Sequence, residues 1–270
     1  MEQNKQRIVV KVGTSTLTHN SGALDLWSME HLVRTLADLQ GMGHEVILVS
    51  SGAIAMGVGK LLLPGKPGDI PTKQAAAAVG QCELMYTYDK LFSEYHHTVA
   101  QILLNGADVE NPERYQNFQN TVSRLLELSA VPIINENDTV VTDEIRVGDN
   151  DTLGAIVAVS VKADLLILLS DIDGLYTADP HKNPDARLLH QVQAVTPEIE
   201  ALAGGAGSAL GTGGMATKLS AAKRCVAGGV EMVIANGADP RILYDIVEGR
   251  TVGTRFSPAK QNLQAGGSRQ

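Results

Sequence analysis

Short apolar runs alternate with helical patterns along the whole chain, and this alternation constrains the fold most strongly. The runs Ile8–Val12, Val46–Val49 and Val131–Ile134 are rich in β-branched residues and do not alternate in polarity. Strands that are apolar throughout are typical of a sheet covered on both faces. Since helical patterns separate them, parallel neighbours with right-handed crossovers are favoured. The pattern predicts an α/β fold, a three-layer α/β/α sandwich with a mostly parallel central sheet.

The same patterns predict where the elements lie. Apolar residues at three- and four-residue spacing predict a helix over 25–40 that ends near Gly41. Further helices are expected at 74–91, 113–128, 153–161, 196–203, 216–227 and 241–248, and further strands at 99–104, 165–169 and 232–235. No Pro/Ser-rich linker divides the chain. We therefore expect a single domain over 1–270, with an N-terminal lobe of about 1–165, a C-terminal lobe of about 166–258 and a tail over 259–270.

Composition excludes several classes of protein. The 270 residues are 44% hydrophobic and 19% charged, which is enough for a sizeable core. A net charge of −8 disfavours a nucleic-acid or anionic-membrane surface, and 4% aromatic residues disfavour base stacking. No run reaches the roughly 18 apolar residues of a membrane helix. Cys82 and Cys225 lie far apart and are typical of reduced thiols, so we expect a cytoplasmic protein.

Small and polar residues follow the expected strands, where parallel sheets bind their ligands. These segments are Val12–Thr16, Ser50–Gly57, Asn135–Thr139 and Ser170–Thr177. One such loop could be a tight turn, but four at one edge indicate a site. A strand followed by Gly, Ser or Thr and then a helix presents N–H groups to an anion. Neither the P-loop nor the dinucleotide fingerprint occurs, so a phosphate-handling protein of another type is indicated.

Two lysines and an acidic segment are the candidate reactive groups. Lys11 interrupts an apolar strand, which is costly unless its ammonium group reaches water or an anion. Lys218 follows a glycine loop in the first turn of a helix, where the helix dipole disfavours a cation unless a phosphate lies between. A strand-end lysine that reaches solvent and a surface lysine remain the alternatives. Helix capping explains one residue of Asp149–Asp151, and the others could orient lysines or hold an ammonium group.

Histidines and metal ligands give no comparable signal. None of the seven histidines falls in these strand-end or glycine loops, and His96 and His97 are interpreted as a solvated turn. No Cys/His spacing suggests zinc, so no metal-ligating residue is predicted.

Six segments in this order resemble a known family: VVKVGTSTLT, VSSGAIAMG, INENDTV, VGDNDTLGA, LSDIDGLYTADP and GTGGMATKLSAA. Over about residues 8–256 the chain resembles the amino acid kinase family, and within it the members that phosphorylate the side chain of free L-glutamate. The resemblance implies the amino acid kinase fold and an enzyme that uses ATP and Mg²⁺ to form L-glutamyl 5-phosphate in proline biosynthesis. It also implies inhibition by proline, a homo-oligomer (dimer or tetramer), and a short form without the PUA domain of many members.

The resemblance also implies roles for individual residues. Lys11 and Lys218 would flank the transferred phosphoryl group, and Asp151 would orient both lysines. Glutamate would lie against Ser51, Asp138 and Asn150, with Gly52, Ala53 and Asn135 nearby. The nucleotide would be bound by Lys11, Gly13, Ser170, Asp171, Tyr176, Thr212, Gly213, Gly214, Met215, Ala216, Thr217 and Lys218. Independently, a glutamate side chain is already ionised at pH 7 and needs no general base, which suits the lack of a candidate histidine.

Other functions stay open at this point. A sister kinase could act on acetylglutamate, aspartate, carbamate, UMP or isopentenyl phosphate, and only the resemblance of NENDTV and GDND favours free glutamate. A non-catalytic amino-acid sensor on the same fold would not need both lysines and Asp151. A nicotinamide-dependent oxidoreductase is disfavoured because the dinucleotide fingerprint is missing.

Overall fold

A single sheet forms the centre of the molecule. The computed structural model describes residues 5–19, 23–140, 147, 149–180, 182–203 and 214–258. Within these residues eight strands form one sheet in the order β3-β4-β2-β1-β5-β7-β8-β6, and β8 runs antiparallel to β7 while the other pairs are parallel. The strands are β1 (Arg7–Val12), β2 (Glu45–Ser50), β3 (Val99–Leu104), β4 (Val131–Glu136), β5 (Leu165–Ser170), β6 (Gln191–Val192), β7 (Glu231–Asn236) and β8 (Thr254–Phe256).

Helices connect most of these strands. They are α1 (Thr14–Leu17), α2 (Leu26–Gly41), α3 (Ala53–Lys60), α4 (Ile70–Ser93), α5 (Gly106–Glu110), α6 (Pro112–Glu127), α7 (Asn150–Ser160), α8 (Pro197–Ala203), α9 (Met215–Ala227) and α10 (Ile242–Val247). Asp25, Asp69 and Asn111 begin α2, α4 and α6, and each side chain accepts a hydrogen bond from the first turn of its helix. Such caps satisfy N–H groups that have no partner within a helix. No helix in the described part of the chain combines the length and apolar character needed to cross a membrane.

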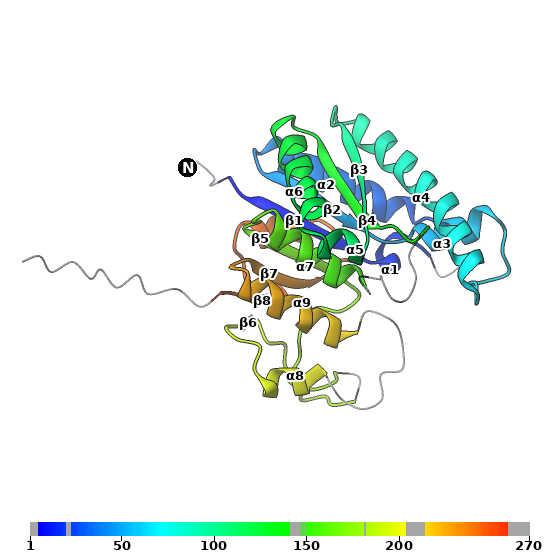
Figure 1. The fold of residues 1–270 in the computed structure, drawn as a ribbon. Coiled ribbons are helices and arrows are strands. Elements are labelled where there is room, and N and C mark those ends of the chain that lie inside the picture. Colours follow the sequence, from blue (N-terminus) through cyan, green and yellow to red (C-terminus); the bar gives the residue numbers. More distant parts are fainter. Residues whose placement is uncertain are drawn as a thin grey trace, which may run out of the picture.

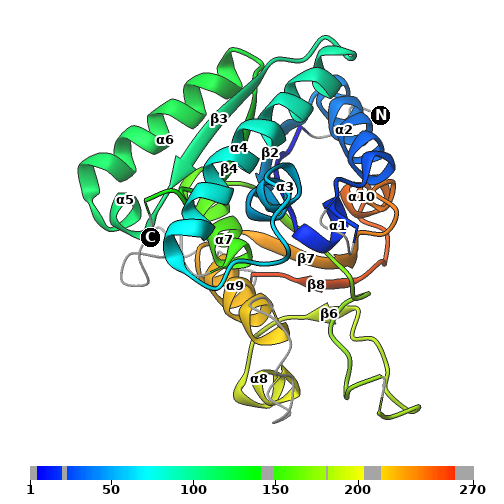
Figure 2. The ribbon, with the colours of Figure 1, turned by 90° about the vertical axis from the view of Figure 1, so that its right-hand side faces the viewer.

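Helices cover both faces of the sheet (Figures 1 and 2), and an apolar layer lies between the sheet and the helices on each face. On one face, Ile8 and Val10 of β1 pack in a cluster that contains residues of α2, α4 and α10. On the other face, Val9 packs in a cluster with residues of α6, α7 and α9. Successive residues of β1 are thus buried on opposite faces, as the apolar run predicted. The three-layer α/β/α sandwich is confirmed.

The structure differs from the prediction in the short elements. Helix α4 begins at Ile70 rather than 74 and α7 at Asn150 rather than 153, and α1, α3 and α5 were not predicted. Strands β6 and β8 were also missed, because two and three residues are too few to show a period. The predicted tail over 259–270 lies outside the described residues. The positions of the central strands β1, β2, β4, β5 and β7 were predicted correctly within about two residues.

Candidate active site

The carboxyl ends of β1, β2, β4 and β5 lie at one edge of the sheet, since these strands are parallel neighbours. The loops that follow them are the glycine-containing and polar segments picked out in the sequence. Gly52, between β2 and α3, has a φ of +102°, a left-handed conformation that side chains rarely adopt. A Cβ at Gly13 would lie 3.7 Å from Lys11 Nζ, so glycine there leaves the space beside the ammonium group open. This edge of the sheet is the candidate site.

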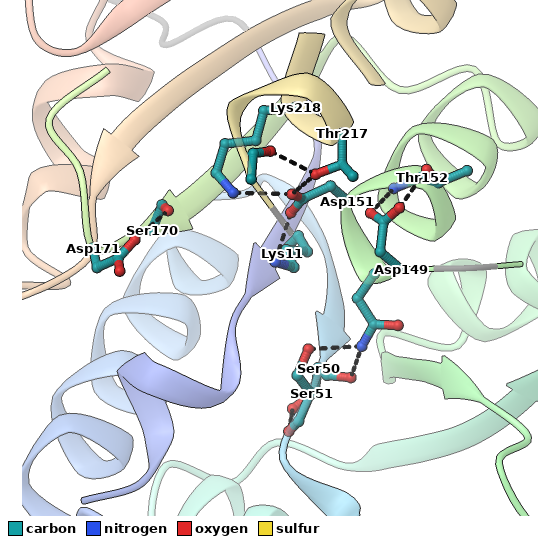
Figure 3. A network of polar contacts seen from close by, with 12 residues as sticks. Lys11, Ser50, Ser51, Asp149, Asp151, Thr152, Ser170, Asp171, Thr217 and Lys218 are labelled. Carbon is teal, nitrogen blue, oxygen red and sulfur yellow. Dashed lines mark hydrogen bonds and ion pairs between the residues drawn. The ribbon is translucent and has the colours of Figure 1, made fainter. Parts of the chain in front are cut away.

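Asp151 lies between the two predicted lysines (Figure 3). Its Oδ1 is 2.6 Å from Lys11 Nζ, and its Oδ2 accepts a hydrogen bond from Lys218 Nζ at 3.0 Å. Lys11 comes from β1, Asp151 from the first turn of α7 and Lys218 from the first turn of α9. The structure therefore brings together three groups that are 140 and 67 residues apart in the chain (151 − 11 and 218 − 151).

The start of α9 supports this cluster. Gly214 is the N-cap residue of α9, and the Thr217 hydroxyl lies 2.8 Å from Gly214 O and 3.1 Å from Asp151 Oδ2. The single hydroxyl hydrogen of Thr217 can thus be donated either to the carboxylate of Asp151 or to the first turn of its own helix. Met215 and Ala216 continue that turn, so the N-terminus of α9 opens beside the lysines. Thr212 and Gly213, predicted to bind nucleotide, lie outside the described residues.

Burial makes this cluster unusual. The side chains of Lys11, Asp151 and Lys218 are 10%, 1% and 6% exposed. Burial alone would raise the pKa of Asp151, but the ammonium groups of Lys11 and Lys218 outweigh it and hold this pKa below its usual value. One carboxylate and two ammonium groups leave a net charge of +1 in a largely buried place. An anion that enters this edge would balance the charge.

A chain of amide side chains lies next to the lysines. Asn150 Nδ2 donates to Ser50 O at 2.8 Å, to Ser51 Oγ at 2.7 Å and to Asn135 Oδ1 at 3.1 Å. Asn135 is buried, and its Nδ2 donates to Gln81 Oε1 at 2.9 Å. Of the predicted substrate residues, Asn150 therefore contacts both Ser51 and Asn135. Ala53 opens α3 beside them, and Asp138 lies half-buried in the turn after β4.

The predicted nucleotide residues of β5 form a separate group. The buried Ser170 ends β5, and its hydroxyl donates to Asp171 at 3.1 Å. Figure 3 places both residues beside the lysine cluster, on the side away from Ser50 and Ser51. Tyr176 lies further along the loop, and its hydroxyl donates to Asp173 at 3.0 Å rather than to any residue of the cluster. This hydrogen bond to Asp173 raises the pKa of Tyr176.

Sequence reasoning missed the contribution of α4. Gln81 contacts Asn135, and the buried Tyr88 hydroxyl lies 2.8 Å from Ser50 Oγ. Burial raises the pKa of Tyr88, so this phenol stays protonated. Asp149 caps α7 through Thr152 N at 2.9 Å, so capping does explain one residue of that acidic segment. In sequence, a glutamine and a tyrosine within an alanine-rich helix give no sign that they contact loops of the sheet.

The sequence profile of the amino acid kinase family matches residues 6–236 of this chain. The chain belongs to the amino acid kinase family. Similar family members include a protein of Clostridium tetani (strain Massachusetts / E88), named glutamate 5-kinase. It is 57% identical over 255 residues, which cover 94% of this chain and 96% of that protein. A glutamate 5-kinase of Clostridium perfringens (strain 13 / Type A) is 54% identical over 262 residues, which cover 96% and 97%.

Solved structures of other kinases share the fold. The carbamate kinase from Giardia lamblia bound to AMP-PNP has a TM-score of 0.69 at 16% identity and covers 96% of this chain and 100% of its own. The isopentenyl phosphate kinase of T. acidophilum, a product complex, has a TM-score of 0.65 at 18% identity, with coverage of 93% and 99%. At these identities the likeness concerns the fold, so the predicted amino acid kinase fold is confirmed.

Proposed function

We propose that this chain transfers the γ-phosphoryl group of ATP to the side-chain carboxylate of L-glutamate, the first step of proline biosynthesis. The proposal rests on the buried Lys11–Asp151–Lys218 cluster with its net positive charge. A carboxylate that approaches a triphosphate meets strong repulsion, and two fixed ammonium groups offset it. The relatives named glutamate 5-kinase, 54–57% identical over nearly the whole chain, support glutamate as the acceptor.

The chemistry requires charge stabilisation rather than proton transfer. A γ-carboxylate oxygen of glutamate attacks the γ-phosphorus of ATP, a new O–P bond forms, and the bond to the β-phosphate oxygen breaks. ADP leaves with that electron pair, and no proton has to move because the attacking group is already ionised at pH 7. Lys11 and Lys218 would contact the oxygens of the transferred group, where charge is concentrated during transfer. Catalysis then consists of positioning and preorganised electrostatics.

The two substrates would approach this cluster from opposite sides. Glutamate would bind in the N-terminal lobe, against Ser51, Asp138, Asn150 and the Gly52–Ala53 backbone. ATP would bind in the C-terminal lobe, along Ser170–Asp171 and the start of α9. The contact of Asn150 with Ser51 supports a glutamate site within the N-terminal lobe, and the contact of Lys218 with Asp151 places the lysine cluster where the two lobes meet.

Mg²⁺ fits this edge as a partner of the triphosphate. Among the described residues no group of three or more His, Cys, Asp or Glu side chains could hold a metal ion. Magnesium is commonly held by substrate phosphates, water and only one or two carboxylates, and Asp171 is an exposed carboxylate at this edge. When bound, the ion would neutralise charge on the phosphates.

The competing acceptors can be separated in one assay. ATP-dependent ADP release is measured with glutamate, acetylglutamate, aspartate, carbamate, UMP and isopentenyl phosphate at equal concentrations. We expect turnover with glutamate to exceed that with each other acceptor by at least tenfold. Turnover that is greatest with another acceptor would identify a sister kinase, and no turnover with any acceptor would favour a sensor.

Regulation, assembly and location form the remaining part of the proposal. Proline would compete at the glutamate site, because it offers the same α-carboxylate and a similar cationic nitrogen. A homo-oligomer would cover some of the large exposed apolar side chains, which include Trp27, Leu62 and Tyr86. The free thiols of Cys82 and Cys225 suit the reducing cytoplasm. Sedimentation and proline inhibition assays test the first two points.

A further inference from the structure

Helix α4 contributes a buried glutamine to the edge of the sheet where glutamate is proposed to bind. Gln81 is 7% exposed, and its Oε1 accepts the hydrogen bond from Asn135 Nδ2. Gln81 of α4 is thus in direct contact with Asn135, a residue expected near the substrate. The role inferred below rests on the proposed function.

Two backbone groups fix the direction of the amide chain. Ser50 O can only accept, so the side of the Asn150 amide that faces it must be the NH₂ group. Glu136 N can only donate, so the side of the Asn135 amide that faces it, at 2.9 Å, must be the oxygen. Asn135 Nδ2 then faces Gln81, which must present its oxygen. The orientation of all three amides follows from hydrogen-bonding chemistry.

This direction decides what Asn150 can offer a ligand. Asn135 Oδ1 accepts from both Glu136 N and Asn150 Nδ2, so its oxygen is fully used by the protein. The Nδ2 atom of Asn150 faces acceptors of the protein. The Oδ1 atom of Asn150 accepts a hydrogen bond from none of the described residues. Oδ1 is the end of the chain left for a donor, and the α-ammonium group of an amino acid is such a donor.

Close packing of α3 against α4 fixes the position of α4 relative to the loop after β2. A Cβ on Gly80 would lie 1.7 Å from Ala53 O, and a Cβ on Gly57 would lie 1.8 Å from Ala76 O. Both contacts are with backbone atoms, so α3 and α4 approach more closely than any larger residue would allow. Gln81, next to Gly80, is thereby fixed relative to the Gly52–Ala53 backbone.

We propose that Gln81 is a positioning residue for the amino-acid substrate. Its oxygen holds Asn135, and through Asn135 it holds Asn150 with an acceptor oxygen available to the ammonium group of the substrate. Without that oxygen, Asn135 Nδ2 loses its acceptor, while Glu136 N still holds Asn135 Oδ1. A buried donor that lacks a partner is costly, so Asn135 would rearrange.

The test separates the two substrates. In Gln81→Met, similar in length but without an acceptor, we expect the glutamate KM to rise about tenfold and the ATP KM to change less than about twofold. Gln81→Asn, which withdraws the oxygen by one methylene, should show the same selective rise and provides a second variant if the first fails to fold. Leu84→Met, a packing change nearly one turn further along α4, is the control, with both KM values unchanged. Equal rises in both KM values would indicate a merely structural role and overturn the proposal.

A double-mutant cycle tests whether Gln81 acts through Asn135. If it does, the glutamate KM of the double variant Gln81→Met/Asn135→Ala exceeds that of Asn135→Ala by less than about twofold. A full tenfold effect in that background would overturn the proposal. Wild-type turnover decides the proposed function separately. If the wild type does not phosphorylate glutamate, both fall; if it does and Gln81→Met leaves the glutamate KM unchanged, only the positioning role falls.

Discussion

The two ends of the parallel strands use charge in opposite ways. At the amino end, Glu45 pairs with Lys5 at 2.9 Å and with Arg7 at 2.7 Å, and these side chains are 22–64% exposed. At the carboxyl end, Asp151 pairs with Lys11 and Lys218 at similar distances, but these side chains are at most 10% exposed. The pairs have similar geometry and differ in their access to water.

This difference indicates which charged groups are not explained by the stability of the fold. Exposed pairs contribute up to about 1 kcal/mol each, and their charges stay hydrated. A buried carboxylate shared by two ammonium groups pays for desolvation three times and still leaves a positive charge. Replacing such a group by apolar side chains often stabilises a protein. The cluster at the carboxyl end is therefore explained by the anions it would bind rather than by stability.

The largest effect is expected from Asp151→Asn. Without the carboxylate, two ammonium groups lie close together in a buried place, so the free energy of unfolding should fall by about 3–5 kcal/mol at pH 7. Because the folded pKa of Asp151 is below its usual 3.8, the carboxylate stabilises the fold above that pH and loses this effect as the pH falls through the lowered value. Urea unfolding at pH 7 measures the loss. A change below about 0.5 kcal/mol would contradict the account of the cluster.

Removing either lysine should abolish most catalysis. We expect Lys11→Ala or Lys218→Ala to lower turnover by at least about a hundredfold, as loss of a preorganised charge contact does. Steady-state assays at saturating ATP and glutamate give the value. Near-normal turnover in either variant would rule out the role assigned to that lysine.

Asp138→Ala should affect one substrate. The glutamate KM is expected to rise at least about tenfold, since the carboxylate proposed to hold the ammonium group of the substrate is lost, while the ATP KM stays within about twofold. The two KM values are measured on the same preparation. A similar rise in both would refute the assignment of Asp138 to the amino-acid side.

A smaller, pH-dependent effect is expected at the amino end of β2. His44 is buried there, accepts from Gln6 N at 3.3 Å, and its Nε2 has no partner among the described residues. Burial lowers the pKa of His44 from its usual 6.5, so the neutral form stabilises the fold above pH 6.5 and this stability declines at lower pH. The unfolding free energy of the wild type, relative to His44→Gln, should therefore be lower at pH 5 than at pH 8. An equal difference at both pH values would contradict this.

The smallest effect is expected from Lys5→Met, which removes an exposed pair with Glu45. Unfolding free energy should change by less than about 0.5 kcal/mol and turnover should not change. This variant is the matched control for Lys11, since both lysines pair with a carboxylate near β1. A loss of turnover in Lys5→Met would show that burial does not separate lysines needed for catalysis from lysines that are not.

The sequence predicted the sheet and the loops at its carboxyl edge because strand periodicity and loop chemistry are local signals. Lys11 was noticeable as a charge in an apolar strand, and Lys218 as a cation at a helix N-terminus. The contacts of Gln81 with Asn135 and of Tyr88 with Ser50 could not be predicted, because they depend on how α4 packs against α3. That packing depends on Gly57 and Gly80, which in sequence are only two glycines within helices. The contacts of such residues depend on tertiary packing, which has no local signal in the sequence.

The most direct test of the central claim is to measure turnover and unfolding free energy of Lys218→Met on one preparation. If the positive charge of Lys218 serves to bind the reacting anions, turnover falls at least about a hundredfold. The free energy of unfolding then stays equal to or above that of the wild type. Wild-type turnover in a variant that unfolds several kcal/mol more easily would show that Lys218 serves the fold instead, and would contradict the account.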